Sequence, residues 1–87
     1  MYLILVYDVG EKRVAKVCKY LRTVLTWVQN SVFEGEVTKA QLAKIKSRLA
    51  KIMVSEEDNI LFYIMSAEKW IERDQMGTTK NDRTNFL

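Results

Sequence analysis

The stretch that decides the fold is Tyr2-Leu-Ile-Leu-Val-Tyr7, which is followed at once by Asp8-Val9-Gly10. A continuous apolar run with β-branched and aromatic side chains predicts a strand that is buried on both faces. From Glu11 the apolar period changes to that of a helix, with apolar residues at positions 14, 17, 18, 21, 24 and 25. These positions share one face, so the strand is predicted to lead directly into an amphipathic helix.

Two short strands, a second helix and a last strand are predicted further along the chain. Residues 27–29 and 32–33 have strand character, and a turn at Asn30-Ser31 is favoured over one at Glu34-Gly35. Thr38 is a suitable helix N-cap, because its hydroxyl can accept a hydrogen bond from a free backbone N–H. An apolar stripe at positions 42, 45, 49 and 52 follows it, and residues 60–65 form a second continuous apolar run.

The order βαββαβ is that of an α+β, ferredoxin-like sandwich, in which two helices cover one face of an antiparallel sheet. We expect residues 1–76 to form this domain and residues 77–87 to form a polar C-terminal tail. Trp70-Ile71 is expected to supply an extra C-terminal edge strand. Because the first and last main strands are apolar at consecutive positions, the open face should be covered, most simply by the same face of a second copy in a homodimer.

Charge divides the chain into two parts. Residues 1–51 carry ten Lys or Arg against four Asp or Glu, whereas residues 52–87 carry four against seven. Ten of the fourteen basic residues lie on the two predicted helices. A basic first part suits a polyanionic partner such as nucleic acid, and it is equally consistent with an ordinary solvated face.

The composition excludes several classes of chemistry. The chain has no histidine and a single cysteine, Cys18, which excludes an internal disulfide, a cysteine zinc cluster and the nucleophile pairs that need histidine. Without these groups, any reaction must use carboxylates, hydroxyls and a hard metal ion. No phosphate loop or dinucleotide fingerprint is present, which argues against nucleotide-dependent catalysis. The first apolar run is too short for a membrane span or a signal-peptide core, so we expect a cytoplasmic location and no membrane partner.

Asp8 is the leading candidate for chemistry, because it closes a buried strand at the rim of the sheet. One interpretation is that its carboxylate caps the first helix. The other needs the dimer, in which a two-fold axis near the strand ends would bring two Asp8 carboxylates together and a cation would relieve their repulsion. Mg²⁺, one ion shared across the dimer, suits such an all-oxygen site and would activate a water against a phosphodiester. Tyr7 and Ser31 are hydroxyl candidates, and Phe33 is either a core residue or a stacking platform.

Two segments together resemble a known family. Met1-Tyr-Leu-Ile-Leu-Val-Tyr-Asp-Val9, followed by a basic helix with Arg13-Val14-Ala15, is similar to its opening strand and helix. Val28-Gln29-Asn30-Ser31-Val32-Phe33-Glu34-Gly35 is similar to its second signature, Q-x-S-V-F-E-G. The chain thus resembles the CRISPR-associated endoribonuclease family, the small subunit of the spacer-integration complex, over roughly residues 1–76.

The resemblance implies a function and a set of site residues. Family members are homodimers that bridge integrase subunits and hold the duplex DNA to be inserted as a spacer, with a late strand adding to the partner's sheet. Some are metal-dependent nucleases on single-stranded RNA or duplex DNA. By this similarity Asp8 is the paired metal ligand and a catalytic residue, together with Tyr7 and Ser31, and residues 77–87 are a docking segment for the integrase. The expected nucleic-acid contacts are Arg13, Lys12, Lys16 and Phe33.

The sequence departs from the family pattern at Trp27, where many relatives carry arginine. The loss of that guanidinium would weaken phosphate binding near the site, which affects nuclease activity more than a scaffolding role. Two other interpretations stay open. One is a stand-alone ribonuclease toxin of the virulence-associated D type, which resembles the same fold and strand end, and the other is a ligand-sensing ferredoxin-like regulator.

Overall fold

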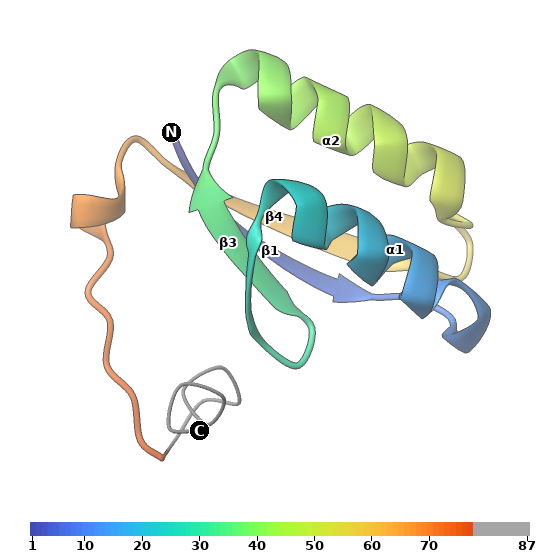
Figure 1. The fold of residues 1–87 in the computed structure, drawn as a ribbon, viewed down its shortest axis with the longest axis horizontal. Coiled ribbons are helices and arrows are strands. Elements are labelled where there is room, and N and C mark those ends of the chain that lie inside the picture. Colours follow the sequence, from blue (N-terminus) through green and yellow to red (C-terminus); the bar gives the residue numbers. More distant parts are fainter. Residues whose placement is uncertain (78–87) are drawn as a thin grey trace.

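The computed structural model describes residues 1–77, in which a four-stranded antiparallel sheet carries two helices on one side (Figure 1). Along the chain the elements are β1 (Tyr2–Asp8), α1 (Glu11–Val24), β2 (Thr26–Gln29), β3 (Val32–Glu36), α2 (Lys39–Ile52), β4 (Asn59–Met65) and a 3₁₀ turn, η1 (Glu68–Trp70). The strand order in the sheet is β2-β3-β1-β4. The predicted α+β, ferredoxin-like arrangement is therefore confirmed.

β1 lies inside the sheet, with β3 on one side and β4 on the other. Successive side chains of a strand point to opposite faces. Leu3 and Leu5 point to the helix side and are fully buried, and Tyr7 on the same side is nearly so. They join buried residues from both helices and from β3 in one core cluster, which includes Val17, Leu21, Phe33, Ile45 and Leu49.

The opposite face of the sheet carries the alternate residues of β1 and β4. Ile4 and Val6 are half-buried there, and their register partners on β4 are Tyr63 and Leu61. Tyr63 is 54% exposed and Leu61 is 45% exposed. In a single chain β4 is thus buried only toward the helices, and the predicted burial of its other face requires a second molecule.

The turns and caps follow local sequence chemistry. Asn30 has a φ of 41°, the left-handed conformation that asparagine tolerates in a tight turn, which confirms the predicted break between β2 and β3. The predicted N-cap at Thr38 is confirmed as well. Its Oγ1 accepts a hydrogen bond from Gln41 N at 3.1 Å, and its own backbone N donates to Gln41 Oε1 at 2.8 Å.

The predicted C-terminal edge strand is absent from the described residues. Trp70 ends η1, and residues 71–77 form neither a helix nor a strand within residues 1–77. A strand needs the free edge of a neighbour, and the prediction placed that neighbour in a second copy, which a single chain does not contain. Arg73 instead pairs with Glu34, whose carboxylate also accepts a hydrogen bond from the Tyr2 hydroxyl.

Two further expectations meet the limits of the described residues. The predicted tail, residues 77–87, lies outside them except for Gly77. Within residues 1–77, neither helix combines the length and the apolar character that crossing a membrane requires.

Candidate functional site

Asp8 is the last residue of β1 and faces solvent at the rim of the sheet. It lies opposite Asn59 of β4. Because side chains alternate along a strand, Asp8 shares the open face with Ile4 and Val6 and not the core with Leu5. The carboxylate therefore stands at one end of the apolar face that the helices leave uncovered.

Asp8 does not cap the first helix. The N-cap position of α1 is Gly10, a residue that has no side chain to cap the helix, and the Asp8 carboxylate does not take its place. Within the part of the chain that the structure describes, the Asp8 carboxylate makes no hydrogen bond or ion pair. The capping interpretation is therefore wrong, and both carboxylate oxygens are available to an external partner.

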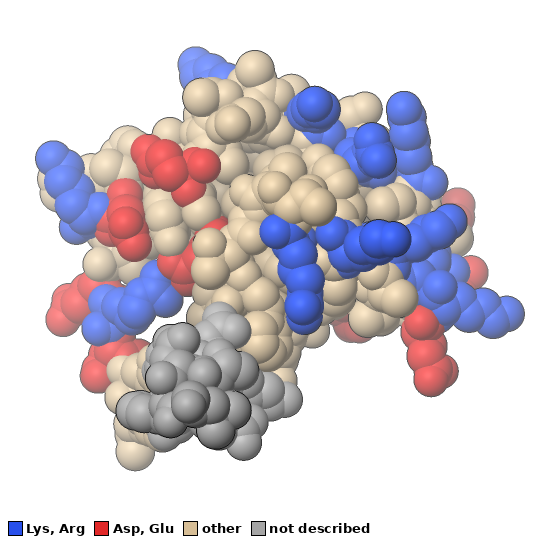
Figure 2. Space-filling model, viewed as in Figure 1, with Lys and Arg blue, Asp and Glu red and all other residues tan. Residues whose placement is uncertain are grey.

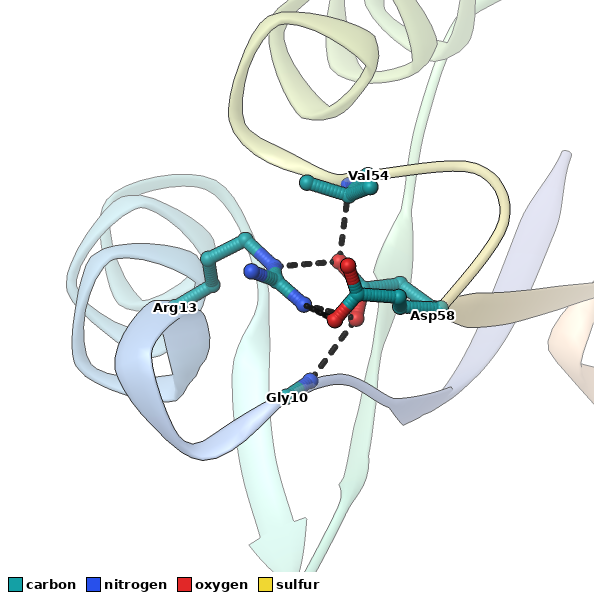
Figure 3. A network of polar contacts seen from close by, with 5 residues as sticks. Gly10, Arg13, Val54 and Asp58 are labelled. Carbon is teal, nitrogen blue, oxygen red and sulfur yellow. Dashed lines mark hydrogen bonds and ion pairs between the residues drawn. The ribbon is translucent and has the colours of Figure 1, made fainter.

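The turn behind Asp8 is held by a second carboxylate, that of Asp58, which precedes β4 (Figure 3). Its side chain is fully buried and accepts four hydrogen bonds. Arg13 Nε and Nη2 donate at 2.6 and 2.8 Å, Gly10 N at 2.7 Å and Val54 N at 2.8 Å. We call this group the Asp58 clamp. It ties the β1–α1 turn, the first turn of α1 and the end of α2 to one side chain.

The clamp keeps its carboxylate ionised. The hydrogen bond from the Arg13 guanidinium lowers the pKa of Asp58 well below its usual range, and the N–H groups of Val54 and Gly10 act in the same direction. Burial opposes this shift, because it disfavours the charged form. The positive charge of Arg13 therefore outweighs the cost of burying Asp58. The carboxylate stays ionised at neutral pH, and the turn that follows Asp8 stays anchored.

Tyr7 occupies the core side of the same strand end. Its hydroxyl lies 2.8 Å from Cys18 Sγ and donates to the carbonyl of Asn30 at 3.4 Å. Burial, followed by the hydrogen bond with Cys18, raises the pKa of Tyr7 to about 12. At neutral pH the side chain is thus a neutral phenol, which can hold a neighbour by hydrogen bonding but does not act as a base. Ser31 lies beside it, and its carbonyl accepts a hydrogen bond from Tyr7 N at 3.1 Å.

The predicted nucleic-acid contacts separate into two groups. Lys12 and Lys16 are exposed on α1. Arg13 is turned inward, with 18% of its side chain exposed, and it is bonded to Asp58 and Glu57. Phe33 is completely buried under the helices, so its ring is not open to a base in this conformation. Phe33 contacts the site through the ring of Tyr7, and the two ring centroids are 6.1 Å apart.

Trp27 packs beside the β2–β3 turn. The guanidinium of Arg22 lies 5.6 Å from its ring centroid, and its indole N–H donates to the carbonyl of Asn30 at 3.0 Å. An arginine from α1 is therefore positioned over the residue that departs from the family pattern.

A single chain supplies only part of a metal site. No cluster of three or more His, Cys, Asp or Glu side chains with metal-binding geometry occurs among residues 1–77. Asp8 offers free carboxylate oxygens at the rim. This donor set fits Mg²⁺, which commonly binds through one or two carboxylates and keeps most of its waters, and it does not fit zinc, which prefers nitrogen and sulfur ligands.

Comparison with known proteins identifies the family. The family model described as CRISPR associated protein Cas2 matches residues 1–73. The chain belongs to the Cas2 family. A relative from Methanosarcina acetivorans, named CRISPR-associated endoribonuclease Cas2, is 48% identical over 87 residues, which is the whole length of both proteins. A relative of the same name from Thermotoga maritima is 43% identical over 94% of each chain.

Solved Cas2 structures share the fold. A crystal structure of a Cas2 matches with a TM-score of 0.84 and 48% identity, over 92% of this chain and 90% of the other. The Streptococcus pyogenes Cas2 structure at pH 6.5 matches with a TM-score of 0.78 and 34% identity, over 88% of this chain and all of the other. The architecture described above is thus that of experimentally determined members of the Cas2 family.

Sequence reasoning did not identify the Asp58 clamp. Asp58 follows Glu56 and Glu57 in an acidic run, and nothing in that run distinguishes the buried member from the two exposed ones. The ion pair between Asp58 and Arg13 is also not apparent from the sequence, because the two residues are 45 positions apart. The only local signal is its position immediately before a continuous apolar strand.

We expect Asp58→Ala to lower the melting temperature much more than Glu57→Ala. The first variant leaves a guanidinium and two backbone N–H groups without their acceptor, whereas Glu57 is exposed and its contact with Arg13 is 3.4 Å long. Thermal unfolding followed by circular dichroism, at one protein concentration, measures both. Equal losses in the two variants would show that the clamp contributes no more than a surface ion pair.

Acid should weaken the clamp. The folded pKa of Asp58 is lower than its unfolded value of about 3.9. Its contribution to stability is therefore complete above the unfolded value and is lost as the pH falls toward the folded one. Urea titrations at several pH values below about 5 should show a steeper loss of unfolding free energy for the wild type than for Asp58→Asn. Asp74→Asn, at an exposed site, is the control, and parallel curves for wild type and Asp58→Asn would contradict the prediction.

Proposed function

We propose that this chain is a homodimeric CRISPR adaptation protein that binds duplex DNA between integrase subunits and cleaves nucleic acid through a pair of Asp8 carboxylates. The observation that carries the proposal is the place of Asp8, free and exposed at one end of an apolar sheet face. Membership of the Cas2 family, whose curated members are named endoribonucleases, supports it.

The open face is the surface on which a second copy would pack. Leu61 and Tyr63 are about half exposed there, beside the half-buried Ile4 and Val6. In a two-fold interface only residues near the axis meet their own copies, and residues farther away meet different ones. Since Asp8 lies on the rim of this face, an axis near the strand ends would bring the two Asp8 side chains together.

The two Asp8 carboxylates, one from each copy, would then together hold a single Mg²⁺ ion. When bound, the ion would supply positive charge for the transition state and make water more acidic. The protein's own part is to present the carboxylates. The Asp58 clamp holds the turn after Asp8 in place, and Tyr7 and Ser31 hold the adjoining β2–β3 turn against β1. Two like charges so placed repel without a cation, which favours loading of the metal.

The basic helix provides a surface for phosphates beside this site. Lys12 and Lys16 are exposed on α1, which begins three residues after Asp8. Contacts between lysine and phosphate position a nucleic acid without reading its sequence. This suits both a duplex held as a spacer and a single-stranded RNA, and it requires no exposed aromatic ring, in keeping with the burial of Phe33.

Cleavage of single-stranded RNA and of duplex DNA should require both Asp8 and Mg²⁺. Asp8→Asn keeps the shape of the side chain but removes its charge, so we expect activity to fall to the level seen with a chelator. Asp74→Asn, another exposed carboxylate on the same chain, should retain full activity. Duplex binding without cleavage in all three proteins would leave a scaffold in the integrase assembly. Toxicity on expression and no capture of an integrase subunit would favour the ribonuclease toxin.

The dimer should depend on the open face alone. We expect Leu61→Lys to yield monomers in analytical ultracentrifugation, because it buries an unpaired charge at the interface. Ile64→Lys is a matched control, since Ile64 is 46% exposed against 45% for Leu61 but lies on the helix side of β4. A dimer that survives Leu61→Lys, or one broken equally by both variants, would show that another surface pairs the chains.

A further inference from the structure

A groove is lined by residues of α1 and α2. These helices cover the side of the sheet opposite the open face (Figure 1). The groove has a cavity volume of about 830 Å³ and is lined by residues of both helices and of the end of β3. Asp8, Tyr7 and Ser31 do not line it, and of the predicted site residues only Lys16 does. The groove is therefore a feature apart from the Asp8 site.

The floor of the groove is apolar. Val24 of α1 is 41% exposed, although it belongs to the apolar stripe of that helix. Ile45 and Ile52 of α2 line the same space, the first almost fully buried and the second partly exposed. Covering such a strip removes apolar surface from water, which favours an occupant with apolar side chains of its own.

The edges of the groove are cationic. Lys16 and Lys19 stand on α1, and Lys44 and Arg48 stand on α2. All four are exposed, and none forms an ion pair with a carboxylate of residues 1–77. The one carboxylate in the lining, Glu36, lies 3.6 Å from the N-terminal ammonium group. Figure 2 shows Lys and Arg side chains gathered over the region of the two helices, around surface formed by uncharged residues.

A nucleic acid matches this groove poorly. Single strands bind by stacking bases on aromatic faces. The aromatic ring in the groove is that of Tyr20, and the guanidinium of Arg48 already lies over it, 5.4 Å from its centroid. A duplex would reach the lysines at the edges but would leave the floor of Val24 and Ile52 uncovered. An apolar floor between cationic edges instead complements a peptide with an apolar face and acidic flanks.

Residues 78–87 do not have that composition, because they contain Lys80 and Arg83 against a single acid, Asp82. The charge and the apolar floor of the groove instead match an acidic segment of another protein. Each helix has 14 residues, a length of about 21 Å, so a partner helix of three to four turns would span the groove. An amphipathic helix laid into a groove between helices is a common mode of peptide recognition.

We propose that the groove between α1 and α2 is a docking site for an acidic amphipathic helix of a partner protein. The apolar face of that helix would cover Val24 and Ile52, and its carboxylates would pair with Lys16 and Lys44 at the two edges. The proposal does not rest on cleavage at Asp8, and it gives the helix face a protein partner in addition to the nucleic acid proposed above.

The test measures the binding of two synthetic helical peptides by fluorescence anisotropy. One has leucines along one face and glutamates elsewhere, and the other has serine in place of every leucine, so that both carry the same charge. We expect the leucine peptide to bind at least about tenfold more tightly. Val24→Ser should remove most of that difference, whereas Lys44→Gln should weaken both peptides. Lys69→Gln, an exposed lysine outside the groove, should change neither, and Asp8→Asn should leave both affinities unchanged.

Three results would overturn the proposal. The first is equal affinity for the two peptides, which would mean attraction by charge alone. The second is an affinity for the leucine peptide that Val24→Ser does not change, with circular dichroism showing the variant folded. The third is displacement of the peptide by a short DNA duplex whose own binding needs Lys16 and Lys44 but not Val24, which would assign the groove to nucleic acid. Because Asp8→Asn is measured alongside, failure here is distinguishable from failure of the nuclease proposal.

Discussion

The structure depends on one buried ion pair, that of Asp58 with Arg13. A carboxylate buried completely is unfavourable unless every lone pair is used and a positive charge lies beside it. Here Arg13, Gly10 and Val54 meet both conditions. These donors come from three separate segments, so the pair fixes where β1 ends, where α1 begins and how α2 returns to β4. The position of Asp8, two residues before Gly10, follows from that constraint.

The two sides of the sheet then differ in what they can bind. On the helix side, the core fills the space between the sheet and the helices. The outer surface between the two helices forms a groove with cationic edges. The open side has no helix to cover it and carries Leu61, Tyr63 and the Asp8 carboxylate. A self-complementary apolar surface suits a second copy, and a charged groove suits a different molecule. A small domain can thus offer one side of its sheet to a second copy of itself and the other side to a different molecule.

Local patterns were sufficient to predict the elements of this fold but not its long-range contacts. The apolar periods of β1 and α1, the turn at Asn30 and the cap at Thr38 are local in sequence, and each was confirmed. The inward turn of Arg13 was not predictable, because it depends on a carboxylate 45 residues away. The missing fifth strand has a different cause, since that strand was expected to pair with another chain. The sequence likewise did not show that the Asp8 carboxylate is free, because this depends on Gly10, and not Asp8, being the N-cap residue of α1.

The availability of the basic residues is a better guide to nucleic-acid binding than their number. Five basic residues lie on α1, and a count would assign all of them to a polyanion. Arg13 is occupied by Asp58, and Arg22 lies over the ring of Trp27. A phosphate competing for Arg13 would have to leave Asp58 buried without its counter-charge, which is strongly unfavourable. Along α1 the charges that no carboxylate neutralises are therefore those of its exposed lysines and of Arg22, and the lysines are divided between the Asp8 end and the groove.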